Sequence, residues 1–121
     1  MKKKPESTQY DLEERTFEFA KKVRSFVKKL PRSISNAEDV RQVVKSSGSV
    51  GANYIEANEA LSKKDFVMRI KICRKEAKES AYWLRLVDVG ENVELGEERK
   101  ILQQEANELT SIFGAILQKS K

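Results

Sequence analysis

The sequence predicts an all-α protein that folds as an up-down-up-down antiparallel four-helix bundle. The 121 residues include only five glycines and two prolines, and 36% of the residues are charged. This composition is typical of helical chains rather than of sheet proteins. Apolar residues recur every three or four positions in four long stretches, which short connections join. The length fits one domain with a substantial core.

Residues 1–10 are basic and polar, so we interpret them as a flexible arm ahead of a bundle domain at 11–121. The first helix is predicted at about residues 11–30, and Pro31 ends it because the residue before a proline avoids helical geometry. Acidic residues in its first turn and lysines in its last turn suit the helix dipole. Its apolar stripe contains Leu12, Phe19, Val23, Phe26, Val27 and Leu30.

The second helix is predicted at about residues 36–61, where Ser35 and Glu38 have the spacing of a capping box. Gly48 and Gly51 each cost about 1 kcal/mol relative to alanine inside a helix. The apolar periodicity continues through both glycines without a shift, so we expect a neighbouring helix to approach closely there. The inner face contains Val40, Val43, Val44, Ser47, Gly51, Tyr54, Ile55 and Asn58.

The third helix is predicted at about residues 63–89, with Ser62 and Asp65 as its cap and Gly90 as its stop. Its heptad seam contains Phe66, Ile70, Cys73, Ala77, Ser80, Leu84 and Val87. The fourth helix is predicted at about residues 95–118. Its seam contains Leu102, Ala106, Leu109, Ile112, Phe113, Ile116 and Leu117.

The two central helices have residues outside the core stripe that need a separate explanation. At about 100° per residue, an apolar and acidic strip of the third helix lies far from its core seam. The second helix carries no charge at residues 46–55 and points small polar residues away from the core. We interpret this second face as a subunit interface, with an irregular, wide core as the alternative. The second face comprises Ser49, Asn53, Glu56, Met68, Ile72, Glu76, Glu79, Trp83 and Leu86.

Several function classes are excluded by composition. The chain has no histidine, which removes His-dependent triads and imidazole metal ligands, and the single Cys73 cannot form an internal disulfide. No stretch is long and apolar enough for a membrane span, and the first residues do not match a signal peptide. We therefore expect a cytoplasmic protein without cofactor, metal site or membrane partner.

The segment from Ser46 to Leu86 resembles the four helix bundle protein family, also called 23S rRNA-intervening-sequence proteins. The resemblance covers both central helices, and the flanking helices agree in length and position. The family's usual Glu-Gly is Glu56-Ala57 here. The residues that carry the resemblance are Ser49, Asn53, Glu56, Ala57, Ser62, Asp65, Phe66, Lys75, Glu76, Glu79, Tyr82, Trp83 and Leu84.

The resemblance implies a left-handed bundle that assembles as a homopentamer. It also implies kinship with the accessory protein of diversity-generating retroelements, a pentameric bundle that binds nucleic acid and a reverse transcriptase. It does not imply catalysis.

The leading hypothesis is a non-enzymatic homo-oligomeric scaffold that binds RNA or DNA without sequence specificity, with structured RNA as the first choice of ligand. The formal net charge is +5, and residues 63–89 alone carry eight basic and four acidic groups. Six basic side chains form one basic stripe on the third helix, which can bind phosphates or simply be a solvated face. The basic stripe comprises Lys64, Lys71, Arg74, Lys75, Lys78 and Arg85.

Two alternatives belong to other classes. In the first, the strip around Trp83 docks another protein instead of a sister subunit. In the second, Glu56 and Glu59 combine with Glu76 and Glu79 to hold Mg²⁺ in a nucleotide hydrolase. The helical positions of Glu56 and Glu59, about 60° apart and outside the core stripe, argue against this hydrolase. We therefore expect no enzymatic activity.

Overall fold

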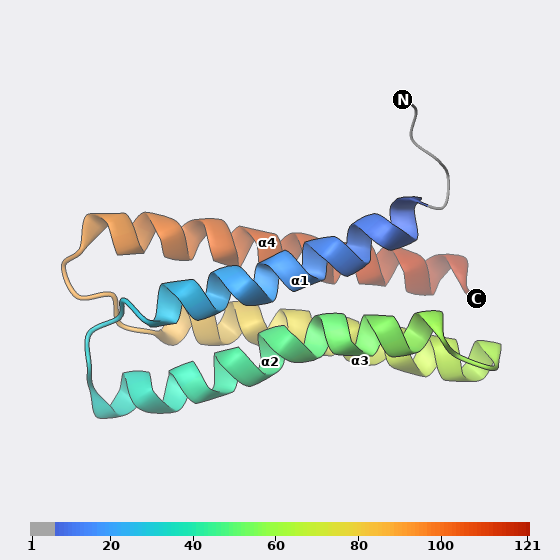
Figure 1. Ribbon diagram of the computed structural model, residues 1–121, viewed down its shortest axis with the longest axis horizontal. Coiled ribbons are helices and arrows are strands. Elements are labelled where there is room, and N and C mark those ends of the chain that lie inside the picture. Colours follow the sequence, from blue (N-terminus) through green and yellow to red (C-terminus); the bar gives the residue numbers. More distant parts are fainter. Residues whose placement is uncertain (1–6) are drawn as a thin grey trace.

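The computed structural model describes residues 7–121, with side chains from Asp11 onward. It contains four helices, α1 (Ser7–Val27), α2 (Ile34–Asn58), α3 (Lys63–Leu86) and α4 (Val93–Lys119). Figure 1 shows them side by side along one long axis, with successive helices running in opposite directions. The predicted all-α four-helix bundle is confirmed. No helix of the described chain is both long enough and apolar enough to cross a membrane.

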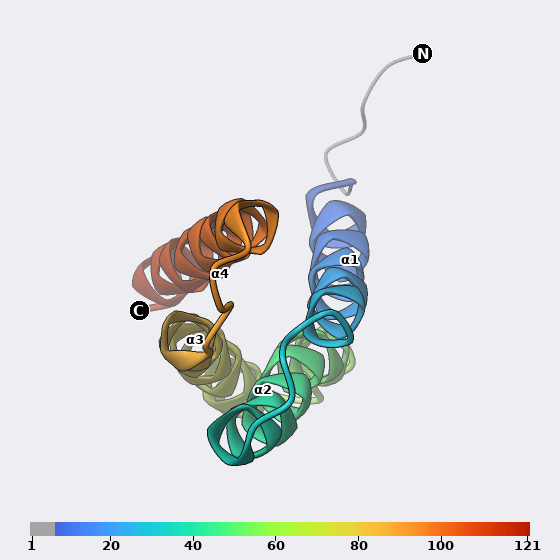
Figure 2. The same cartoon turned by 90° about the vertical axis from the view of Figure 1, so that its left-hand side faces the viewer.

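The four helices form a ring in which each contacts its neighbours in sequence and α1 also contacts α4 (Figure 2). α3 has the most extensive packing, against α2 on one side and α4 on the other. α1 packs less extensively, mainly on α2. α2 and α3 therefore form the most extensively packed pair of helices.

The core contains the apolar stripes that the periodicity predicts, because each helix turns one face toward the bundle axis. Phe66, Val27 and the last apolar residues of α4 are only partly buried. Two residues of α2 differ from the predicted inner face. Ile55, predicted to face the core, is 51% exposed, and Val50, which was not predicted there, is fully buried. The largest fully buried side chains are Phe19, Phe26, Phe113, Ile70, Leu84 and Leu109.

The glycines of α2 allow the close approach that the sequence predicts. α2 runs unbroken through both. A Cβ atom at Gly51 would lie 2.9 Å from Oγ1 of Thr16 in α1, and one at Gly48 would lie 3.2 Å from the Arg24 guanidinium. α1 therefore crosses α2 at a distance that a side chain at position 51 would prevent.

The predicted ends of the first helix are wrong at both termini. α1 begins at Ser7, so residues 7–10 belong to the helix, while the rest of the predicted arm, residues 1–6, lies outside the described residues. α1 ends at Val27, before the predicted Leu30. The amides of Lys29 and Leu30 bond to carbonyls three residues earlier, so the chain leaves the helix through a tight turn.

The second helix begins earlier than its predicted cap because Asn36 is needed in its first turn. The N-cap is Ser33, whose hydroxyl accepts the Asn36 amide at 3.1 Å, and not Ser35. The buried Asn36 amide group donates to the carbonyls of Pro31 and Asp88, both at 2.9 Å, and its oxygen accepts the Asp88 amide at 2.9 Å. Asn36 thereby joins the α1–α2 loop to the α3–α4 loop.

The remaining helix ends differ from prediction by up to three residues. α2 ends at Asn58, before 61, and Ser62 caps α3 as predicted, accepting the Asp65 amide at 3.1 Å. α3 ends at Leu86 rather than at 89, because Arg99 of α4 donates to the carbonyl oxygen of Val87 at 2.5 Å. Gly90 therefore lies in the following turn, with φ of 68°, and α4 extends from Val93 to Lys119 rather than over 95–118.

Candidate functional site

The second face lies on α2 and α3, where Glu56, Met68, Glu79 and Leu86 are exposed and its other five members are partly buried. Met68 and Leu86 are 46% and 49% exposed, so the chain's own fold leaves about half of each apolar side chain uncovered. Ile72 is partly buried, and so is Trp83, which packs against the core. Trp83 thus contributes to the fold of the single chain as well as to the second face.

A hydrogen-bonded cluster links the two helices of the second face. The Asn53 amide nitrogen donates to the carbonyl and hydroxyl oxygens of Ser49, at 2.9 and 3.0 Å. Arg69 of α3 donates to the Asn53 side-chain oxygen at 2.9 Å. The bond from Arg69 links α3 to α2, and the bonds to Ser49 fix the Asn53 side chain on α2.

The carboxylates of the second face are dispersed. Glu76 is mostly buried, with 17% of its side chain exposed, and it pairs with Lys75 at 3.6 Å. Glu56 and Glu79 are exposed, and no ion pair or hydrogen bond of their side chains is found among the described residues. Residues 11–121 contain no group of three or more carboxylate or thiol side chains that could hold a metal ion. Glu56, Glu59, Glu76 and Glu79 therefore do not form one cluster in the described chain.

All six side chains of the basic stripe are exposed. Among the described residues, Lys75 is the one member of the basic stripe with an ion pair, which it forms with Glu76. Arg74 and Lys71 line a depression of about 500 Å³ beside α4, together with the exposed Lys121 near the end of the chain. The basic stripe therefore borders the α3–α4 side of the bundle, whereas the second face borders α2.

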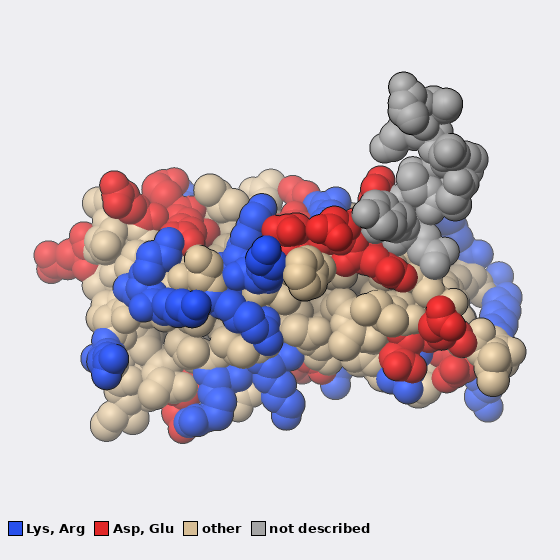
Figure 3. All heavy atoms as spheres, viewed as in Figure 1, with Lys and Arg blue, Asp and Glu red and all other residues tan. Residues whose placement is uncertain are grey.

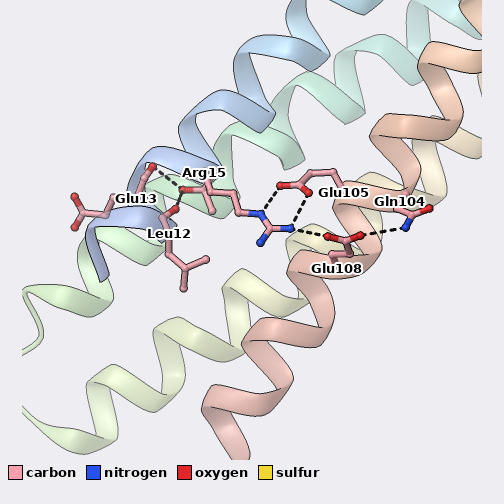
Figure 4. A network of polar contacts seen from close by, with 7 residues as sticks. Leu12, Glu13, Arg15, Gln104, Glu105 and Glu108 are labelled. Carbon is pink, nitrogen blue, oxygen red and sulfur yellow. Dashed lines mark hydrogen bonds and ion pairs between the residues drawn. The ribbon is translucent and has the colours of Figure 1, made fainter. Parts of the chain in front are cut away.

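A polar network that sequence periodicity does not predict joins α1 to α4 (Figure 4). Arg15 of α1 points toward α4 and donates to both carboxylate oxygens of Glu105, at 2.7 and 2.9 Å, and to Glu108 at 2.8 Å. Hydrogen bonding to Glu105 raises the pKa of the Arg15 guanidinium. The pKa of Glu108 is lowered, mainly by a hydrogen bond from Gln104 and to a smaller extent by the one from Arg15. The two helices are therefore joined by charge-assisted contacts at the solvent boundary.

Two further polar features sit inside the bundle. The hydroxyls of Ser46 and Ser80 lie 2.8 Å apart in the core between α2 and α3, and Ser80 also donates to the Glu76 carbonyl at 2.9 Å. The Cys73 thiol is fully buried, and burial raises its pKa to about 12. A thiol with this pKa is not a nucleophile near neutral pH. Cys73 therefore acts as a small core residue.

Comparison with known proteins places these surfaces in a family context. A solved structure with the same fold, from Bacteroides thetaiotaomicron, is described as a protein of unknown function from the S23 ribosomal protein family. It is 25% identical to this chain and superposes with a TM-score of 0.70. The matched region covers 87% of this chain and 96% of the Bacteroides chain. No curated protein matches the sequence. The profile of the 23S rRNA-intervening sequence protein family matches residues 8–115, and the chain therefore belongs to this family.

Proposed function

We propose that the protein is a non-enzymatic homo-oligomeric scaffold, formed by five chains that contact one another through the second face. The scaffold presents the basic stripe of each chain to the phosphates of RNA or DNA. The half-exposed apolar side chains of the second face carry this proposal.

The second face has the properties of a surface that another chain covers. Met68 lies one helical turn from the partly buried Ile72, and Leu86 lies one turn from the partly buried Trp83, so each exposed side chain extends an apolar neighbour. Apolar anchors beside partly buried aromatic rings are the usual centre of a protein interface. The exposed Glu56 and Glu79 border this surface, and a sister chain can supply the cations that pair with them.

The nucleic-acid part of the proposal is supported by the exposure of the basic stripe. Five of its six cations have no ion pair among the described residues. Free cations along one helix can replace the counterions that surround a phosphate backbone, which favours binding without base recognition. Several copies of the stripe in one oligomer would strengthen this binding through avidity.

The experiment is a mass measurement on the wild type and on two variants. The double variant Met68→Glu, Leu86→Glu places charges on the apolar part of the second face. Ile101→Glu on α4, which is 67% exposed, is the matched control. We expect the wild type and the control to have five times the 13.9 kDa mass of one chain in light scattering, and the double variant to be monomeric with unchanged helicity.

Three outcomes would contradict the proposal. A monomeric wild type at micromolar concentration would rule out the oligomer and favour a module that docks another protein through the second face. A double variant with the wild-type mass would rule out the second face as the interface. Magnesium-dependent nucleotide hydrolysis that Glu76→Gln abolishes would show that the protein is an enzyme.

A further inference from the structure

A groove follows the outer side of the bundle between α1 and α2. Two depressions, of about 670 Å³ and 340 Å³, share Arg24, Gly48 and Ala52 in their walls and therefore adjoin. The missing side chain at Gly48 leaves the space into which the Arg24 guanidinium fits, 3.2 Å from the place of a Cβ atom. The two depressions thus form one continuous surface, which we call the α1/α2 groove.

One end of the α1/α2 groove is strongly cationic. Arg24, Arg41 and Lys45 line it, and the exposed Lys28 lies in the turn that follows α1. Residues 19–37 contain six basic and no acidic residues. Figure 3 shows the resulting cluster of Lys and Arg atoms over α1 and α2.

The charge at this end is only partly compensated within the chain. The Arg24 guanidinium donates to the carbonyl oxygens of Ala20 and Val44, at 3.2 and 3.5 Å, and not to a carboxylate among the described residues. Arg41 pairs with Glu38 at 2.7 Å, whereas no salt bridge of Lys45 is found there. Arg24 and Lys45 therefore remain available to an external anion.

The other end of the α1/α2 groove is apolar and contains an exposed aromatic ring. Phe17 and Ile55 are 54% and 51% exposed on its two sides, and small residues form the floor between them. The Lys21 ammonium lies 5.5 Å from the centre of the Phe17 ring. Glu13 also lines this end and accepts a hydrogen bond from Asn58 at 2.8 Å. Its carboxylate would repel a phosphate, so an anionic ligand places its charge at the Arg24 end.

We propose that the α1/α2 groove binds a single-stranded segment of nucleic acid, with phosphates at Arg24, Lys28 and Lys45 and an unpaired base on Phe17. The proposal rests on the nucleic-acid binding proposed above and adds a second surface, distinct from the basic stripe. Cations beside an exposed aromatic ring are the usual means of binding single strands, since every base has a face that can stack. A duplex keeps its bases paired and cannot use the apolar end. RNA and DNA share the phosphodiester and the bases, so both should bind.

The experiment compares two triple variants that change the net charge equally. Arg24→Glu, Lys28→Glu, Lys45→Glu alters the α1/α2 groove, and Lys71→Glu, Arg74→Glu, Lys78→Glu alters the basic stripe. Fluorescence anisotropy measures binding of a short unstructured RNA, its duplex and the DNA equivalents. We expect the groove variant to lose about tenfold or more in affinity for single strands and the stripe variant to lose less. Helicity and oligomer mass serve as folding controls.

A second pair of variants isolates the stacking contact. Phe17→Ala removes the ring of the α1/α2 groove, and Tyr82→Ala removes a ring on α3 that is 55% exposed, almost the same as Phe17. We expect Phe17→Ala to weaken single-strand binding about fivefold or more and to leave duplex binding unchanged. Tyr82→Ala should change neither.

The possible results separate this proposal from the proposed function. Wild-type single-strand affinity in both Phe17→Ala and the groove variant would overturn the α1/α2 groove site, while duplex binding lost in the stripe variant would still support the proposed function. A wild type that binds no nucleic acid in 50 mM salt, a condition that favours phosphate contacts, would overturn both.

Discussion

Gly51 determines how closely α1 can approach α2. The position of its absent Cβ atom is 2.9 Å from Thr16 Oγ1 and 3.3 Å from Thr16 Cβ. Thr16 itself is buried and donates to the Leu12 carbonyl at 2.8 Å, so its side chain cannot turn away without losing this hydrogen bond. The absence of a side chain at position 51 therefore lets α1 and α2 pack this closely.

We predict opposite effects of alanine at two helical glycines. Gly51→Ala should destabilise the protein by about 1 kcal/mol or more, because the clash with Thr16 exceeds the gain in helix propensity. Gly96→Ala is the matched control, since nothing lies within 4 Å of its added Cβ, and it should stabilise by up to about 1 kcal/mol. Urea unfolding measures both. Equal effects of the two variants would contradict the close approach.

Cys73 should be unreactive in the folded protein. Its pKa of about 12 means that almost no thiolate exists at pH 8, and the side chain is fully buried. We expect negligible reaction with a chromogenic disulfide reagent at pH 8, and rapid, complete reaction in concentrated urea. Fast labelling of the folded protein would show that the core around Cys73 opens.

At the scale of the helices, α1 is the element held by polar contacts. It packs less extensively than the others, and the Arg15 network joins it to α4. Lys29, in the turn after α1, also pairs with Glu98 of α4 at 2.9 Å. α2 and α3 instead share an extensive packed interface with the Ser46–Ser80 contact inside it. We infer that α1 separates from the bundle more readily than any other helix.

The pH dependence of stability tests this network. The pKa of Glu108 is lowered in the folded protein, so its contribution to stability is present above the ordinary glutamate pKa of about 4.3 and is lost as the pH falls through the folded value. Arg15→Gln should reduce the loss of folding stability at acid pH. It should also increase amide exchange in the first half of α1. Arg32→Gln, a change at an exposed arginine, is the control. An unchanged acid profile in Arg15→Gln would contradict the role of the network.

Two separate surfaces of the described chain carry clusters of positive charge. The basic stripe lies on α3, and the cationic end of the α1/α2 groove lies on α1 and α2. The second face lies on α2 and α3. An oligomer formed through the second face would carry both cationic surfaces in every chain.

The basic stripe should contribute a defined part of the salt dependence. For duplex DNA, removing three phosphate contacts with Lys71→Glu, Arg74→Glu, Lys78→Glu should reduce the slope of log affinity against log salt by about 2.7 in magnitude. The loss should be similar for unrelated base sequences, because phosphate contacts carry no sequence information. Binding titrations between 50 and 200 mM salt measure the slope, because affinity changes strongly over this range. An unchanged slope would show that the basic stripe is only a solvated face.

The four helices, most of their core stripes and the two further faces of α3 are predictable from the sequence. These features follow from side-chain periodicity and local caps, which depend on residues three or four positions apart. The Ser62 cap and the continuous α2 are confirmed for this reason. The helix ends at Ser33 and Leu86 differ from prediction because distant partners, Asn36 with Asp88 and Arg99 with Val87, compete with the local signals.

Which polar residues meet, and which surfaces combine, depends on how the helices pack against one another. Arg15 and Glu105 are 90 residues apart in sequence, and Asn36 and Asp88 are 52 apart. No local pattern encodes such pairs, because they depend on how one helix is rotated and shifted against another when the core packs. The α1/α2 groove has the same origin. Phe17, Arg24 and Lys45 share one surface because Gly48 and Gly51 let α1 lie close against α2.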